Sequence, residues 1–326
     1  MLKNRGASLQ KFWADEGFDP SRKKLLLAVS GGSDSVALLE FFHREVIPQQ
    51  HDCQLFAVHI NHRLRVEADE DQAFVEKLCR DRGIPLEVEV LDPANRQTGQ
   101  SVEMWARDSR YQTFARARKN FGADFILTAH HLDDAVETFC LRLWRGTGMA
   151  VLAGIPFQRP DGIVRPLLPV SRADLKAWLL ETGTPWREDL SNANEGIPRN
   201  WVRHHLLPAW RKEEPDLDAR VFRITREVAK LKHSWEKWLE EFYPSEEVRA
   251  RGGIPMEWLR DGEVDSTFLR HLLPLLGVDR PVPEVMAEIM RQTRNSQQRI
   301  QVRVDDGTVL TEKNGALVSI RIALPR

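Results

Sequence analysis

Residues 25–42, LLLAVSGGSDSVALLEFF, decide the fold. The first five are apolar and are followed at once by Ser30, Gly31 and Gly32, which predicts a buried strand that ends in a tight turn. From Ser33 onward the apolar residues recur at helical spacing, which predicts a helix. A strand, turn and helix start in this order aim backbone N–H groups and the positive end of a helix dipole at one point, which suits phosphate.

The spacing of the glycines differs from the two commonest phosphate loops. The segment has neither the Gly-x-x-x-x-Gly-Lys-Ser/Thr pattern nor the Gly-x-Gly-x-x-Gly pattern. The turn at residues 30–35 therefore predicts a phosphate loop of another type.

Composition and charge are those of a globular chain. Its 326 residues predict about two domains, with 42% hydrophobic and 29% charged residues and a formal net charge of −1. There is no apolar run of about 20 residues and no apolar signal core, so a cytoplasmic protein is expected. The three cysteines form no Cys-x-x-Cys pair, which argues against a zinc ribbon or a disulfide framework.

Strand and helix patterns alternate along the first two thirds of the chain. After the first unit, strands are expected at 55–60, 86–91 and 125–129, and helices at 69–82, 102–119 and 134–144. This alternation predicts an α/β fold with a parallel sheet covered on both faces. We expect a boundary near Pro215, giving a catalytic domain at 1–215 and a smaller, mostly helical domain at 216–326 that ends in a β-hairpin.

Polar residues follow the predicted strands at their carboxyl ends, where ligands of parallel sheets bind. His59 and Asn61 close the second strand, and Asp133, Asp134 and Glu137 follow the fourth. On a helix Asp133 and Glu137 share one face. Acids also simply favour a helix N-terminus, so this pattern alone does not require a catalytic role.

The segment Ser-Gly-Gly-Ser-Asp-Ser at 30–35 resembles the signature loop of the PP-loop ATP pyrophosphatases. Further segments resemble one family among them, the tRNA(Ile)-lysidine synthetases. These are SVEMWARDSRYQTF, LTAHHLDDAVETFCLRLWRGTG, VRPLL, WREDLSN and RNWVRHHLLP, in this order along some 180 residues of the chain. That family more often has glycine where Arg63 stands, and longer members carry a further C-terminal domain, so a short form is expected.

The resemblance implies roles for particular residues. ATP would be held by Ser30, Gly31, Gly32, Ser33, Asp34, Ser35, His59 and Arg145. The residues expected to act in catalysis are Asp34, Arg110, Asp133, Asp134 and Glu137. Within that set, Asp34 and Asp134 are expected to bind Mg²⁺, and Asp133 and Glu137 to hold lysine. Contacts with tRNA are expected from Arg107, Arg199, Asn200 and Arg203.

The resemblance also implies the reaction and the partners. The family adenylates C2 of the wobble cytidine in tRNA(Ile) with a CAU anticodon and then joins free lysine there, releasing AMP. ATP and Mg²⁺ are the implied cofactors, and a homodimer is possible in this family. The stretch at 291–303 has four arginines and no acid, so the second domain could also contact RNA phosphates.

Two alternatives remain open from the sequence. A PP-loop tRNA thiolase would share the loop, although thiolases that act on cytidine generally need paired cysteines. A non-catalytic nucleotide- or RNA-binding relative would share the fold without turnover.

Overall fold

The computed structural model describes residues 2–49, 52–96, 99–145, 149–188, 198–242, 245–260, 266–276, 278, 283–293, 300–304, 308–314 and 316–321. Two compact units are formed by Met1–Arg226 and Glu227–Arg326. The division falls inside helix α9 (Leu217–Phe242), later than the boundary expected near Pro215. The first turns of α9 belong to the first unit because Leu217 and Val221 are buried there.

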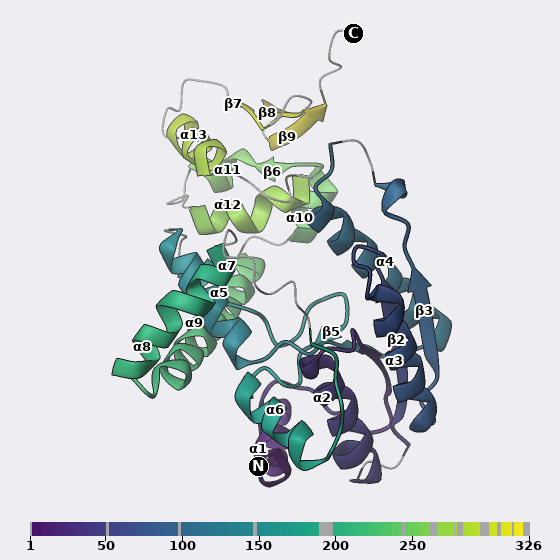
Figure 1. Cartoon of the computed structure of the whole chain (residues 1–326). Coiled ribbons are helices and arrows are strands. Elements are labelled where there is room, and N and C mark those ends of the chain that lie inside the picture. Colours follow the sequence, from purple (N-terminus) through teal and green to yellow (C-terminus); the bar gives the residue numbers. More distant parts are fainter. Residues whose placement is uncertain are drawn as a thin grey trace. The chain divides into compact units, whose positions relative to one another are not determined.

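The first unit is built on a five-stranded parallel sheet in the order β3-β2-β1-β4-β5. Figure 1 labels β2, β3 and β5 of this sheet. Its strands are β1 (Lys24–Ala28), β2 (Gln54–Asn61), β3 (Leu86–Val90), β4 (Phe125–Leu127) and β5 (Ile163–Val164). The strand order changes direction at β1, where ligands of such sheets gather. The predicted α/β fold is thereby confirmed.

Helices cover both faces of this sheet. They are α1 (Leu2–Asp15), α2 (Ser33–Phe41), α3 (Ala68–Asp81), α4 (Val102–Phe121), α5 (Leu132–Trp144) and α6 (Arg172–Glu181). Leu25 and Leu27 of β1 join the core that contains residues of α1, α2, α3 and α6, whereas Leu26 joins the core under α4. This alternation follows from the two-residue repeat of a strand.

Short helices follow α6 and complete the first unit. They are α7 (Pro198–Trp201), the π-helical segment η6 (Val202–Leu206) and α8 (Leu207–Glu213). Other short segments of the chain are η1 (Phe42–Val46), η2 (Ile47–Gln49), η3 (Pro93–Asn95), η4 (Met149–Ala153) and η7 (Leu273–Leu276). Val202 and Leu207 pack with Val136 of α5, so the chain after α7 is fixed against that helix.

The second unit combines helices with a four-stranded antiparallel sheet in the order β6-β9-β8-β7. Its elements after α9 are α10 (Ser245–Arg251), β6 (Ile254–Pro255), α11 (Met256–Arg260), α12 (Ser266–Leu272), α13 (Pro283–Thr293), β7 (Gln301–Arg303), β8 (Thr308–Lys313) and β9 (Ala316–Arg321). The hairpin expected at the end is therefore part of a larger sheet. No helix in the described ranges is long and apolar enough to cross a membrane.

Candidate active site

The loop between β1 and α2 is held in shape by the side chain of Ser35. Its hydroxyl accepts hydrogen bonds from the backbone N–H groups of Ser30 and Gly31 at 3.1 and 3.2 Å, and donates to the carbonyl of Gly32 at 3.0 Å. Gly31 has a φ of 92°, a conformation that favours glycine. The hydroxyl of Ser35 is thus engaged inside the loop, while α2 begins at Ser33 and presents its first N–H groups there.

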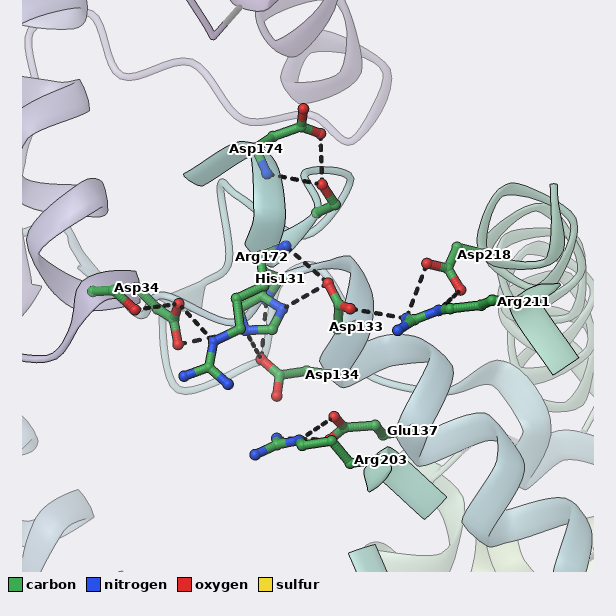
Figure 2. Close-up of polar contacts among 12 residues, drawn as sticks. Asp34, His131, Asp133, Asp134, Glu137, Arg172, Asp174, Arg203, Arg211 and Asp218 are labelled. Carbon is green, nitrogen blue, oxygen red and sulfur yellow. Dashed lines mark hydrogen bonds and ion pairs between the residues drawn. The ribbon is translucent and has the colours of Figure 1, made fainter. Parts of the chain in front are cut away.

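His131 joins the loop to the acids of α5 (Figure 2). The residue is 2% exposed, and Nε2 lies 3.5 Å from Asp34 Oδ2 and 3.6 Å from Asp134 Oδ2. Nδ1 lies 3.6 Å from Asp133 Oδ2. The backbone N–H of His131 also donates to Asp134 at 3.1 Å, which caps α5. Residues from two strand ends therefore form one site.

The electrostatics of this cluster favour charged groups. Burial by itself disfavours a charged imidazole, but Asp34, Asp134 and Asp133 together raise the pKa of His131. Burial likewise opposes ionisation of Asp34, yet His131 and Arg172 lower its pKa. Nε2 of His131 faces two carboxylates and Nδ1 faces a third, which is why the charged form of this ring is favoured despite its burial.

Three arginines from the segment after α6 pair with the same acids. Arg199 lies 2.7 Å from both Asp134 and Glu137, and Arg203 lies 2.6 Å from Glu137. Arg211 of α8 lies 2.8 Å from Asp133. Sequence reasoning assigned Arg199 and Arg203 to an RNA-facing edge, whereas in the structure their guanidinium groups contact the acids.

Arg172 is a member of the site that sequence reasoning missed. Its Nε lies 3.5 Å from Asp34 Oδ1, and its backbone N–H donates to Asp133 Oδ2 at 2.8 Å. Ser171 caps α6 by accepting from Asp174 N at 3.1 Å. The signal in the sequence is Ser171 with Asp174 three residues later, a capping pattern that fixes where α6 starts and hence where Arg172 lies.

Other predicted residues lie outside this cluster. Arg145 is exposed at the end of α5, eleven residues and therefore about 16 Å along the helix from Asp134. His59 is 3% exposed and its Nδ1 lies 2.8 Å from the carbonyl of Val29, and burial lowers its pKa. Asn200 is 7% exposed, so its side chain is largely buried.

Two further predicted arginines lie on α4. Arg107 stacks over Tyr111 of the same helix, with 5.1 Å from its guanidinium carbon to the ring centroid. Arg110 is close enough to His62 to contribute, after burial, to lowering the pKa of that histidine to about 4. Both arginines therefore belong to the helix that covers one face of the sheet, and among the described residues neither forms a hydrogen bond or ion pair with His131.

The residues present fit a divalent cation in part. Asp34 and Asp134 converge on one nitrogen of His131, and two carboxylates are a typical protein contribution to Mg²⁺ bound with phosphates. In the described part of the chain, no group of three or more histidine, cysteine or acidic side chains forms a complete metal site. Phosphate oxygens or water would have to supply the remaining ligands.

Comparison with known proteins places the chain in a family. Residues 1–210 match the PP-loop domain, and the chain belongs to the family that this domain defines. Its fold is also similar to that of the U34-tRNA thiolase NcsA from Methanococcus maripaludis, with a TM-score of 0.60 and 14% identity over 70% of this chain and 80% of that one.

Within this family the chain is similar to curated tRNA(Ile)-lysidine synthases. It is 37% identical to the one from Porphyromonas gingivalis over 81% of this chain and 57% of that protein. The synthase from Nitrosomonas europaea is 31% identical over 84% of this chain and 60% of its own length. The chain thus matches somewhat more than half the length of these relatives.

Proposed function

We propose that this protein joins free lysine to C2 of the wobble cytidine in tRNA(Ile) with a CAU anticodon, using ATP. The observation that carries the proposal is the junction at His131. There the aspartate of the phosphate loop lies 3.5 Å from a histidine that also contacts the acids of α5. A nucleotide-activating loop and a site for a cationic amine would be adjacent in such an arrangement. The similarity to tRNA(Ile)-lysidine synthases supports the choice of substrate.

The reaction would proceed in two displacements. The C2 oxygen of cytidine attacks the α-phosphorus of ATP, and pyrophosphate leaves. The ε-amine of lysine then attacks C2, the C2–O bond breaks and AMP leaves. Because the ordinary pKa of this amine is about 10.4, it must lose a proton before attack.

The chain's own residues would divide this work. Backbone N–H groups at Gly32, Ser33 and the start of α2 would bind phosphate oxygens. Asp34 and Asp134 would hold Mg²⁺, whose charge would neutralise part of the phosphate charge. The lysine ammonium would be held by Asp133 and Glu137.

The arginine pairs impose a condition on lysine binding. Asp133 is paired with Arg211, and Glu137 with Arg199 and Arg203. A lysine ammonium reaching either acid must displace or share a guanidinium contact. We therefore propose that Arg199 and Arg203 change partners when the substrates bind, and that tRNA phosphates are their alternative partners.

Further parts of the proposal concern the remaining predicted residues and the assembly. Arg110 and Arg107 would contact tRNA or the activated base from α4. Arg145, predicted to bind ATP, would bind a phosphate group at the end of α5, and Asn200 would contact tRNA. His59 would support the phosphate loop through its contact with the carbonyl of Val29, the residue that precedes the loop. The second unit, Glu227–Arg326, would bind tRNA, and the protein would act in the cytoplasm, with a homodimer as the assembly that the resemblance suggests.

The test of this function is incorporation of labelled lysine into an unmodified tRNA(Ile) transcript with ATP and Mg²⁺. Asp34→Asn should reduce incorporation by at least about a hundred-fold, because it removes a charge from the loop. Asp124→Asn is the matched control. Asp124 accepts from the backbone N–H of Lys24 at the opposite end of β1 and should keep activity.

The outcomes separate the alternatives. Release of pyrophosphate without label in the RNA would exclude lysine or this tRNA as the substrate. No turnover by the wild-type protein would favour the non-catalytic relative. A thiolase is disfavoured because Cys53, Cys79 and Cys140 are buried as free thiols, and burial raises the pKa of Cys53 to about 11 and that of Cys79 to about 12.

A further inference from the structure

Arg165 is a buried guanidinium that has no charged partner among the residues that the structure describes. It follows β5 and is 4% exposed. Its Nη1 donates to the carbonyl of Pro156, and its Nε has no hydrogen-bond partner. In the part of the chain that the structure describes, no carboxylate forms an ion pair with it. A buried charge of this kind is costly unless a counter-ion is present.

The charges around Arg165 do not supply that counter-ion. Arg107 and Arg159 both lie over the ring of Tyr111, at 5.1 and 4.7 Å from its centroid, and both act on the charge of Arg165. The nearby acid Asp161 is paired with Arg159 at 2.7 Å. Burial lowers the pKa of Arg165 to about 10, so the side chain remains charged at pH 7. The surroundings are therefore basic.

The location of Arg165 connects it to the candidate active site. β5 is paired with β4, and β4 with β1, so the ends of β5 and β1 are two strand spacings, about 10 Å, apart at the same edge of the sheet. His130 follows β4 between them and bonds to Thr128 at 3.0 Å. Burial and the charge of Arg165 lower the pKa of His130 to about 4, which keeps this imidazole neutral.

We propose that Arg165 is an anion-binding residue whose ligand is a phosphate group. This inference rests on the proposed function, whose two substrates that carry phosphate are ATP and the tRNA backbone. A guanidinium is a planar fork of donors that matches phosphate oxygens, and its attraction is strong where water is excluded. The cost of burying Arg165 would then be offset when the substrate arrives.

The experiment compares Arg165→Gln and Arg165→Lys with the wild-type protein. Arg118→Gln is the matched control, because the bonds of Arg118 to described residues also go to backbone carbonyls, those of Ala123, Asp124 and Asp161. Four quantities are measured for each protein: the free energy of unfolding, the melting temperature with and without pyrophosphate, the Kd of ATP without tRNA, and the Kd of tRNA without ATP.

We expect Arg165→Gln to raise the Kd of one of the two ligands by at least about ten-fold, as loss of a charge-assisted hydrogen bond should. Arg165→Lys should raise that Kd less than Arg165→Gln does, since lysine keeps the positive charge. The free energy of unfolding should not fall in Arg165→Gln, because an uncompensated buried charge has been removed. Arg118→Gln should be less stable and bind both ligands normally.

The separate binding assays with ATP and with tRNA identify the source of the phosphate. Weaker ATP binding, with loss of the melting-temperature increase by pyrophosphate, assigns Arg165 to the nucleotide. Weaker tRNA binding alone assigns it to the RNA backbone. Unchanged binding of both ligands, or a destabilised Arg165→Gln protein with normal binding, would overturn the inference. Neither binding assay contains lysine, so failure of the proposed ligation would not be confused with failure of this proposal.

Discussion

At the scale of the residue, Gly31 determines whether the phosphate loop can form. Its φ of 92° is strained for any residue with a Cβ, and a Cβ there would lie 3.3 Å from Val75 Cγ2. Gly17 also has a positive φ, of 73°, but a Cβ at that position meets nothing within 4 Å. Comparing the same substitution at the two glycines therefore separates the cost of a positive φ from the cost of a close contact with Val75.

We predict that Gly31→Ala lowers the free energy of unfolding by ~2–3 kcal/mol and weakens ATP binding, because the strained turn must shift against Val75. Gly17→Ala should cost only about 1 kcal/mol and leave ATP binding unchanged. Urea unfolding and ATP titration measure the two effects. Equal losses in the two variants would contradict the role given to the contact with Val75.

His62 gives the protein a specific pH dependence. Burial, with Arg110 and His59, lowers its pKa from 6.5 to about 4. The native state therefore keeps His62 neutral at a pH where the unfolded chain binds a proton. Protonation of His62 in the unfolded chain therefore does not reduce the free energy of unfolding above pH 6.5. It reduces that free energy progressively as the pH falls from 6.5 toward 4.

The free energy of unfolding of the wild-type protein should accordingly decrease between pH 6.5 and 4. His62→Gln should show a shallower decrease, because its side chain takes up no proton on unfolding. His233→Gln, at an exposed position on α9, is the control and should follow the wild-type curve. Identical curves for His62→Gln and the wild-type protein would refute this account.

At the scale of the element, the helix starts determine the geometry of the site. Ser171 caps α6, and Ser101 caps α4 by accepting from Met104 N at 3.1 Å. Only the cap of α6 lies beside a site residue, because Arg172 is the first residue of that helix. The same chemical change at the two caps should therefore have different consequences for activity.

We predict that Ser171→Ala and Ser101→Ala each cost about 1 kcal/mol of stability, the usual effect of losing an N-cap. Ser171→Ala should in addition lower the rate of lysine incorporation, because the N–H of Arg172 bonds Asp133 at 2.8 Å. Thermal unfolding and the labelling assay measure the two effects. A matching loss of activity in Ser101→Ala would show that stability alone was responsible.

The elements also show what the sequence could predict. The strand expected at 25–29 is β1 at Lys24–Ala28, and that at 55–60 is β2 at Gln54–Asn61, because apolar runs bounded by turn residues are local signals. The two-residue strand β6 and the contacts of Arg199 and Arg203 with α5 were not predictable. Both depend on partners far along the chain, which no local periodicity reveals.

The turn at Arg63, where the resemblance led us to expect glycine, has a local structural account. Arg63 adopts a φ of 49°. Its N–H donates to the side chain of Asn61 at 3.0 Å, which supports this turn without a glycine. Asn61 in turn donates to Asp69 and Gln72, so its amide is fully used in holding the start of α3.

At the scale of the whole molecule, the division inside α9 has consequences for truncation. Leu217 is 5% exposed and Val221 is 3% exposed, and both pack with Val136, Val202 and Leu207. Asp218 also pairs with Arg211 at 3.0 Å. The start of α9 therefore completes the packing of the segment that carries the site arginines.

A fragment ending at residue 226 should be more stable than one ending at 215 by about 3 kcal/mol or more, because the shorter one loses the burial of Leu217 and Val221. Urea unfolding of both fragments, followed by circular dichroism, makes the comparison. Equal stabilities would place the boundary at 215, as the sequence suggested.

Each of the three acids of α5 is already paired with an arginine from the segment after α6. Asp133, Asp134 and Glu137 each have an arginine partner at 2.8 Å or less, so the site presents little excess negative charge to solution. Free metal ions and polyamines therefore gain little from approaching it. A cation that reaches one of these acids must displace or share a guanidinium contact, so we expect selection to be made at contact distance and not by long-range attraction.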